Sequence, residues 1–223
     1  MNNLIWFRND LRITDNKSLT LACKGERVIA VYFFDPRHYD LGDFGFKKTE
    51  KYRAKFLLET VKELKEALKK LNITLLTYKE RPEAILPKLV KDFQVKKIFL
   101  QKEWTRDETQ VLNQVIEKVP AFVNFEESYD QFLFHPERIP FNSFEEIPEV
   151  FTNFRKKCEK NVTVLKPLPA PTPMPQENLL TTSTPIPTLK ELGLEEFQTN
   201  SRTAFPFKGG EFAALDRIEE YFW

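Results

Sequence analysis

Four short runs of polar and charged residues follow apolar runs and are the places where this chain could do chemistry. They lie at residues 8–10, 35–37, 79–81 and 101–104. If the apolar runs are parallel strands, these residues lie at the carboxyl ends of the strands, where open α/β sheets bind ligands. Ordinary surface charge or helix capping explains such residues equally well, and Asp10 and Arg12 could simply pair with one another.

The motifs that would assign a reaction are absent. No glycine-rich dinucleotide fingerprint or phosphate loop follows the first apolar run, and there is no nucleophile elbow. The two histidines, His38 and His135, and the two cysteines, Cys23 and Cys158, are too few for a zinc site, a His-based triad or a disulfide framework. We therefore predict no catalytic residues and no metal site in this chain.

The charge balance argues against a strongly electrostatic nucleic-acid binder. The chain has 34 Lys and Arg residues and 33 Asp and Glu residues, a net charge of +1, whereas DNA binding usually relies on clustered Lys and Arg. The first apolar run begins at Leu4, which leaves no room for a targeting peptide. No run approaches the ~20 apolar residues of a membrane span. We expect a soluble protein of a reducing compartment, the cytoplasm.

Short apolar runs alternate with helical patterns through the first 126 residues. After Thr49, a plausible N-cap, apolar residues recur at spacings of four and three, which is typical of a helix with one buried face. Pro82 suits the first position of the next helix, and Pro87 is expected to kink or delay that helix. The expected strands are residues 4–7, 28–34, 73–78, 95–100 and 121–125, and helices are expected near 17–24, after 49, after 82 and at 105–118.

This alternation with short connections predicts an α/β fold. Right-handed crossovers would place helices on both faces of a doubly wound, five-stranded parallel sheet of the Rossmann-like kind. We assign residues 1–130 to this domain.

The rest of the chain has a different composition. Eleven of the fifteen prolines lie at or after Pro136, and seven fall between Pro167 and Pro187. Such a segment runs extended, so residues 131–204 are predicted to be an interdomain linker that crosses another surface, with one short helix at 147–160. Residues 205–223 are predicted to form a helix with an apolar stripe, the start of a helical domain. Because nothing in the chain follows to cover that stripe, either the helix folds back onto the α/β domain or the chain is a fragment of a longer protein, and we expect the fragment.

Six ordered motifs resemble the photolyase/cryptochrome family, most closely its DASH branch. The resemblance extends from residue 4 to the last residue. The motifs are residues 6–12 with Asp15 and Asn16; 34–37; 48–49 with 53–59; 81–86; 147–155; and 207–211 with 214–215 and 221–223.

The resemblance implies a light-driven system in two domains. In this family a helical domain holds FAD, which donates an electron to cyclobutane pyrimidine dimers in DNA or serves blue-light signalling. The N-terminal α/β domain helps to hold an antenna pigment, methenyltetrahydrofolate or a deazaflavin, that passes excitation energy to the flavin. This chain would therefore hold part of an antenna site. FAD and DNA contacts would come from the helical domain, in cis or in trans, and the chain alone would be inactive.

The resemblance also names site residues. Glu103 matches the family glutamate that grips the pterin, and a carboxylate can accept two parallel N–H bonds from an aminopyrimidinone edge. Phe7, Arg8 and Asn9 are expected to line the same cleft, next to Lys102. Two departures are expected to loosen or alter pigment binding, since DASH proteins usually carry histidine where this chain has Gln101 and glycine where it has Glu50.

Two other functions remain open from the sequence. The chain could be a free-standing interaction module of the same fold that docks a partner, such as a separate flavin domain, and binds no pigment. It could also be a generic nucleotide-binding α/β domain, although the absence of glycine-rich phosphate loops counts against this. The sequence does not decide between pterin and deazaflavin, between repair and signalling, or on the oligomeric state.

Overall fold

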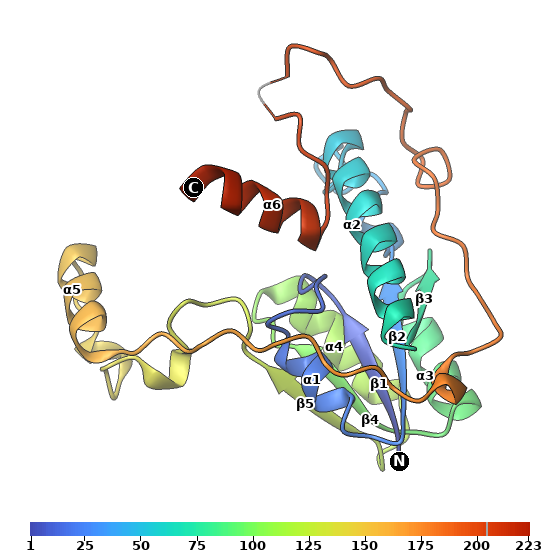
Figure 1. The fold of residues 1–223 in the computed structure, drawn as a ribbon, viewed down its shortest axis with the longest axis horizontal. Helices are drawn as coiled ribbons and strands as arrows, with labels where there is room; N and C mark the ends of the chain where they lie inside the picture. Colours follow the sequence, from blue (N-terminus) through green and yellow to red (C-terminus); the bar gives the residue numbers. More distant parts are fainter. Residues whose placement is uncertain (204) are drawn as a thin grey trace.

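Five parallel strands form the centre of the molecule in the order β3-β2-β1-β4-β5. The computed structural model describes residues 1–203 and 205–223. Figure 1 shows the strands, the helices beside them and a long segment that returns across the domain. The strands are β1 (Asn2–Phe7), β2 (Arg27–Phe33), β3 (Thr74–Tyr78), β4 (Val95–Gln101) and β5 (Asn124–Ser128).

Helices cover both faces of the sheet, which confirms the predicted doubly wound α/β fold. The α-helices are α1 (Lys17–Ala22), α2 (Lys51–Lys70), α3 (Pro82–Asp92), α4 (Arg106–Lys118), α5 (Phe151–Asn161) and α6 (Glu211–Phe222), and the short 3-10 helices are η1 (Pro36–His38), η2 (Pro136–Arg138), η3 (Phe144–Glu146) and η4 (Gln176–Asn178).

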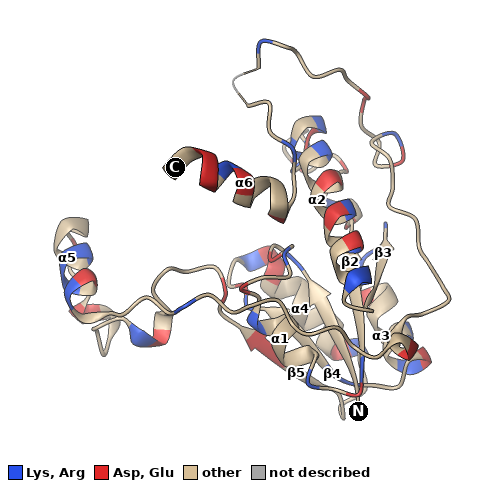
Figure 2. Ribbon diagram, viewed as in Figure 1, with Lys and Arg blue, Asp and Glu red and all other residues tan. Residues whose placement is uncertain are grey.

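The alternation of side chains along β1 divides the core into two layers. Ile5 and Phe7 pack with residues of α1 and α2, whereas Leu4 and Trp6 pack with residues of α3 and α4. This is the period of two that a strand buried on both faces requires. Lys and Glu are mixed along the outer side of α2 (Figure 2), so its apolar face alone turns inward.

Three local predictions are wrong. Helix α2 has Glu50 as its N-cap, not Thr49; Thr49 is buried, and its amide donates to the carbonyl of His38. Helix α3 begins at Pro82 as predicted, but Pro87 does not delay it. The fifth strand is shifted by three residues to Asn124–Ser128, because the residues after Pro120 form a turn. An edge strand as polar as β5 gives a weak apolar signal.

The proline-rich segment, residues 163–203, forms a strap along the domain. Figure 1 shows it passing beneath α1 to the amino ends of the strands and then alongside β3. Its Met174, Leu192 and Leu194 side chains are buried in the core layer beneath α2. The predicted crossing of another surface is therefore confirmed. Ala204, with which the predicted linker ends, lies outside the described residues.

The strap also covers the outer edge of β3. The amide of Thr77 donates to Oγ1 of Thr184 at 2.6 Å, and the Thr77 hydroxyl donates to the carbonyl of Pro185 at 2.9 Å. The amide of Leu180 donates to Oγ1 of Thr74 at 2.9 Å. Because open strand edges invite pairing with other chains, the strap protects this one, and its prolines prevent it from becoming a sixth strand.

The buried side-chain amide of Asn178 helps to fix the strap at the amino ends of the strands. Asn178 Oδ1 accepts from the amide of Val28 at 2.8 Å, and its Nδ2 donates to the carbonyls of Val28 and Asn72 at 3.0 and 2.7 Å. Asn178 is 4% exposed. These three bonds satisfy backbone groups at the start of β2 and before β3 that would otherwise be buried without partners.

Replacing Asn178 with alanine should lower the free energy of unfolding by about 2–3 kcal/mol, because it strands buried backbone groups. Urea unfolding measures this difference. Asn161→Ala is the matched control, since Asn161 is exposed and makes one bond to its own helix; it should change the free energy of unfolding by less than about 0.5 kcal/mol. Equal stability of the two variants would contradict the assigned role.

Candidate functional site

The loop that follows β1, residues 8–16, is built around a buried carboxylate. Asp10 is fully buried, and its Oδ1 accepts from the amide of Arg8 at 2.9 Å. Asn16 Nδ2 donates to the Asp10 carbonyl at 3.0 Å, and Asn16 Oδ1 caps α1 by accepting from the amide of Leu19. The loop therefore has a fixed path, and Asn9 at its tip is exposed.

Asn9 and Glu103 meet across the carboxyl edge of the sheet. Nδ2 of Asn9 donates to Oε1 of Glu103 at 2.7 Å. The two residues follow β1 and β4, which are adjacent strands with Trp6 opposite Leu100. Glu103 is half-buried, and its Oε2 has no hydrogen-bond partner among residues 1–203 and 205–223. Oε1 of the Glu103 carboxylate is thus held by Asn9, and Oε2 is available to accept a hydrogen bond from a ligand.

Arg8 places a half-buried positive charge behind this pair. Its Nη2 donates to the carbonyl of Glu108 at 3.0 Å, and its guanidinium lies 5.2 Å from the centre of the Trp6 ring. Burial lowers the pKa of Arg8, and the nearby carboxylates of Glu103 and Glu108 oppose this. Its Nη1 is buried without a partner in the described part of the chain, which is a donor that a ligand or water can satisfy.

An aromatic cluster lies beside Glu103. The Trp104 ring stacks on Phe132, with centroids 5.0 Å apart and an interplanar angle of 11°, and approaches Tyr129 at 5.4 Å. The Lys102 ammonium lies 5.1 Å from the centre of the Tyr129 ring. Trp104 and Phe132 are 49% and 46% exposed. A planar ligand held by Glu103 would have a flat apolar surface within reach.

The structure brings together most of the residues expected at the site. Arg8, Asn9, Lys102 and Glu103 lie at one edge of the sheet, on the loops after β1 and β4. Phe7 does not join them, because it is 1% exposed and packs into the core layer beneath α2.

The sequence reasoning missed Tyr129 and Phe132. They lie far from Glu103 along the chain, just after β5. A usable signal existed, because these aromatics follow a strand in the same way as Trp104 does.

The other two polar loops are occupied by internal contacts. Arg37 pairs with Asp35 and with Glu83 at 2.9 Å, and both carboxylates are largely buried. Burial is the largest single effect on Arg37 and lowers its pKa. The hydrogen bonds and charges of Asp35 and Glu83 together outweigh it, so the pKa of Arg37 is raised. Lys79 donates to the carbonyl of Glu191 in the strap. These residues brace the domain and leave the loops after β1 and β4 as the candidate site.

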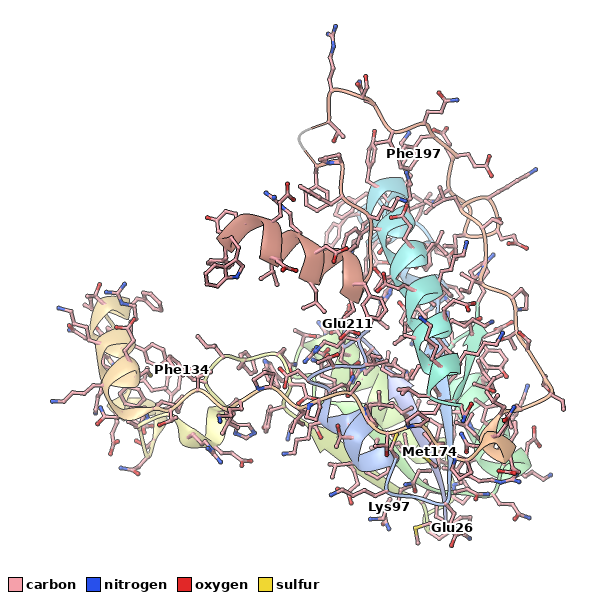
Figure 3. All side chains as sticks on the ribbon, viewed as in Figure 1. Glu26, Lys97, Phe134, Met174, Phe197 and Glu211 are labelled. Atoms are coloured by element: carbon pink, nitrogen blue, oxygen red, sulfur yellow. The ribbon has the colours of Figure 1, made fainter. Side chains whose placement is uncertain are left out.

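Helix α6 is attached to the same loop after β1. Glu211, labelled in Figure 3, accepts from the amides of Ile13 and Thr14 at 2.7 and 2.9 Å. On α2, Glu63 accepts from the amide of Phe212 at 2.9 Å. Gly210 has a φ of 129°, and a side chain there would collide with Glu63. The large apolar residues of α6 and the Trp223 that follows it remain exposed: Phe212, Leu215, Ile218, Tyr221, Phe222 and Trp223.

The described residues contain neither a metal-ligating cluster nor a membrane-spanning helix. No group of three His, Cys, Asp or Glu side chains within residues 1–203 and 205–223 is arranged to hold a metal ion. No described helix is long and apolar enough to cross a membrane.

The family comparison decides the identity of the fold. The family model described as DNA photolyase matches residues 3–175. The chain belongs to the DNA photolyase family. It is similar to cryptochrome DASH of Gloeobacter violaceus, at 40% identity over 222 residues, and to cryptochrome DASH of Xenopus laevis, at 36% over 230 residues. The resemblance seen in the sequence is thereby confirmed.

Solved structures agree with this assignment. The Synechocystis sp. cryptochrome matches 99% of this photolyase-family chain with a TM-score of 0.88 and 33% identity. A photolyase from Sulfolobus tokodaii, solved with two FAD molecules, matches with a TM-score of 0.72 and 21% identity, a likeness of fold alone.

The matches cover only part of each relative. Each of the two matches covers 99% of this chain. The first covers 44% of the Gloeobacter protein, and the second covers 46% of the chain in the Synechocystis structure. It thus spans less than half the length of these relatives.

Asp10 gives a test of the loop after β1. Burial raises the pKa of its carboxyl, and bonds from Arg8 and Asn16 only oppose this. The folded chain therefore keeps the proton to a higher pH than the unfolded chain, in which aspartate titrates near ~3.9. The stabilising contribution is full below that value and is lost as pH rises through the folded pKa.

Asp10→Asn should abolish this pH dependence, because asparagine does not titrate. The free energy of unfolding of the wild type should therefore fall with rising pH relative to that of the variant. Urea unfolding from about pH 4 to pH 8 measures it. Asp43→Asn, at an exposed loop position, is the control and should leave the profile of the wild type unchanged. A wild-type free energy of unfolding that rises with pH relative to that of Asp10→Asn would contradict the raised pKa.

Proposed function

We propose that the carboxyl edge of this domain holds a light-harvesting pigment for a flavin bound in a helical domain. The observation that carries the proposal is the Asn9–Glu103 pair beside the Trp104–Phe132 stack. Membership of the DNA photolyase family and similarity to cryptochrome DASH proteins support it. In this assignment the chain is a binding domain without catalytic residues of its own, and it is inactive alone.

The donor and acceptor set suits a pterin such as methenyltetrahydrofolate. An aminopyrimidinone edge presents two N–H donors, and Glu103 is a carboxylate with Oε2 available. The pigment ring would lie near Trp104, with Arg8 and Lys102 close enough to contact its carbonyl or carboxylate groups. A deazaflavin offers a similar planar ring, so titrations with both pigments are needed to decide the pigment class.

The wider role follows from the family. FAD and DNA, whether for repair of cyclobutane pyrimidine dimers or for blue-light signalling, would be held by the helical part of the whole protein. Helix α6 and the exposed aromatics on it would belong to that part, with residues 1–130 as the antenna domain and 131–204 as the linker. The cytoplasmic location stays a prediction.

A free-standing interaction module is not favoured. The relatives that match this chain along its whole length are named as cryptochromes. The loop residues expected to hold a pigment also lie together in space.

Methenyltetrahydrofolate should bind the purified chain saturably, as followed by its absorption and fluorescence. Glu103→Gln should weaken the Kd about tenfold or more, because a charge-assisted bond pair is lost. Glu117→Gln is the matched control, an exposed glutamate on α4 that lies outside the site, and should leave the Kd unchanged. A parallel titration with a deazaflavin decides the pigment class. Equal binding by wild type and Glu103→Gln would contradict the assigned role of Glu103.

A further inference from the structure

A groove lies at the opposite edge of the sheet from Glu103. It has a volume of about 730 Å³ and is formed by the amino ends of β1 and β4 with the last turns of α3 and α4. Figure 3 labels Glu26, which lines it, close to the N-terminus, and Glu211 far from it near the carboxyl ends. A volume of this size is typical of sites for small molecules.

Three lysines give the groove its charge. Lys91, Lys96 and Lys118 line it. Within residues 1–203 and 205–223 none of them has a carboxylate oxygen within 4.0 Å of its ammonium group. The one lining carboxylate, Glu26, is paired with the α-ammonium group of Met1. In a chain with a net charge of only +1, this is a local concentration of uncompensated positive charge.

One aromatic ring stands among these lysines. Phe122 lines the groove and is 60% exposed. The Lys96 ammonium lies 4.5 Å from the centre of its ring, which holds the ring in place through a cation–π contact. Pro87 and Pro120 add apolar surface nearby. An exposed ring between ammonium groups is the combination that binds a base and its phosphates together.

The usual role of lysine at the end of a helix explains only part of this arrangement. Lys91 and Lys118 lie in the last turns of α3 and α4, where positive charge favours the helix dipole. Lys96 belongs to strand β4 and has no such role.

We propose that this lysine groove binds a free nucleotide, with its phosphates on Lys91, Lys96 and Lys118 and its base against Phe122. The site is separate from the proposed pigment site and uses ammonium groups in place of a glycine-rich loop. Contacts of this kind are screened by salt, so the affinity should fall steeply with ionic strength.

Isothermal titration of the purified chain with ATP at low salt tests the proposal. Saturable binding is expected, and the triple variant K91Q/K96Q/K118Q should weaken the Kd about tenfold or more. Phe122→Leu should weaken it about fivefold while tripolyphosphate binding stays unchanged. The control K156Q/K160Q/K166Q removes three exposed lysines elsewhere and should keep the wild-type Kd. Circular dichroism verifies that each variant is folded.

The outcomes that overturn the proposal are distinct. If ATP does not bind saturably, or if the two triple variants have equal Kd values, the lysine groove is not a nucleotide site. Tripolyphosphate binding as tight as ATP, or an unchanged Kd in Phe122→Leu, reduces the groove to an anion site and excludes the nucleotide. Binding of a short single-stranded oligonucleotide about tenfold tighter than ATP assigns the groove to nucleic acid instead.

Discussion

The buried carboxylate of Asp10 is the constraint on which most of this structure depends. By accepting from the amide of Arg8 and lying against Asn16, it fixes the path of residues 8–16 immediately after the central strand. Several later segments attach to that loop. Asn9 reaches Glu103, the amides of Ile13 and Thr14 hold Glu211, and other groups of the loop meet the strap and the end of β5. A single local turn thereby sets the position of both the candidate site and α6.

The segments beyond the sheet are held by carboxylates and amides that satisfy backbone groups. Asn178 closes the amino ends of the strands, and Glu63 and Glu211 hold the first turn of α6 from its two sides. Such bonds are individually modest, but removing the Asn178 side chain strands buried backbone groups, which costs more than the bonds contribute. The consequence for function is that the edge bearing Asn9 and Glu103 is pre-organised before any ligand arrives.

Much of this arrangement was predictable from the sequence, for identifiable reasons. The β-branched and aromatic strands, and the four-and-three spacing of apolar residues on α2, carry strong periodic signals. Asn9 and Glu103 could be placed together because both follow strands of one parallel sheet. Phe7 lies in the core and not in the cleft, because helices cover both faces of β1 and either parity places the last residue of that strand in a core layer. The role of Asn178 depends on contacts with distant backbone groups, which no local pattern encodes, whereas the position of Phe132 after a strand was a usable signal.

The central claim is that a pigment binds at the edge where β1 and β4 end. Amide chemical-shift mapping by NMR, with methenyltetrahydrofolate added to the labelled chain, tests this most directly. The account predicts shifts concentrated at Arg8, Asn9, Glu103 and Trp104, including the indole N–H of Trp104, and none at Lys118 on the opposite edge. Shifts elsewhere on the domain, or no shifts at saturating pigment, would contradict it.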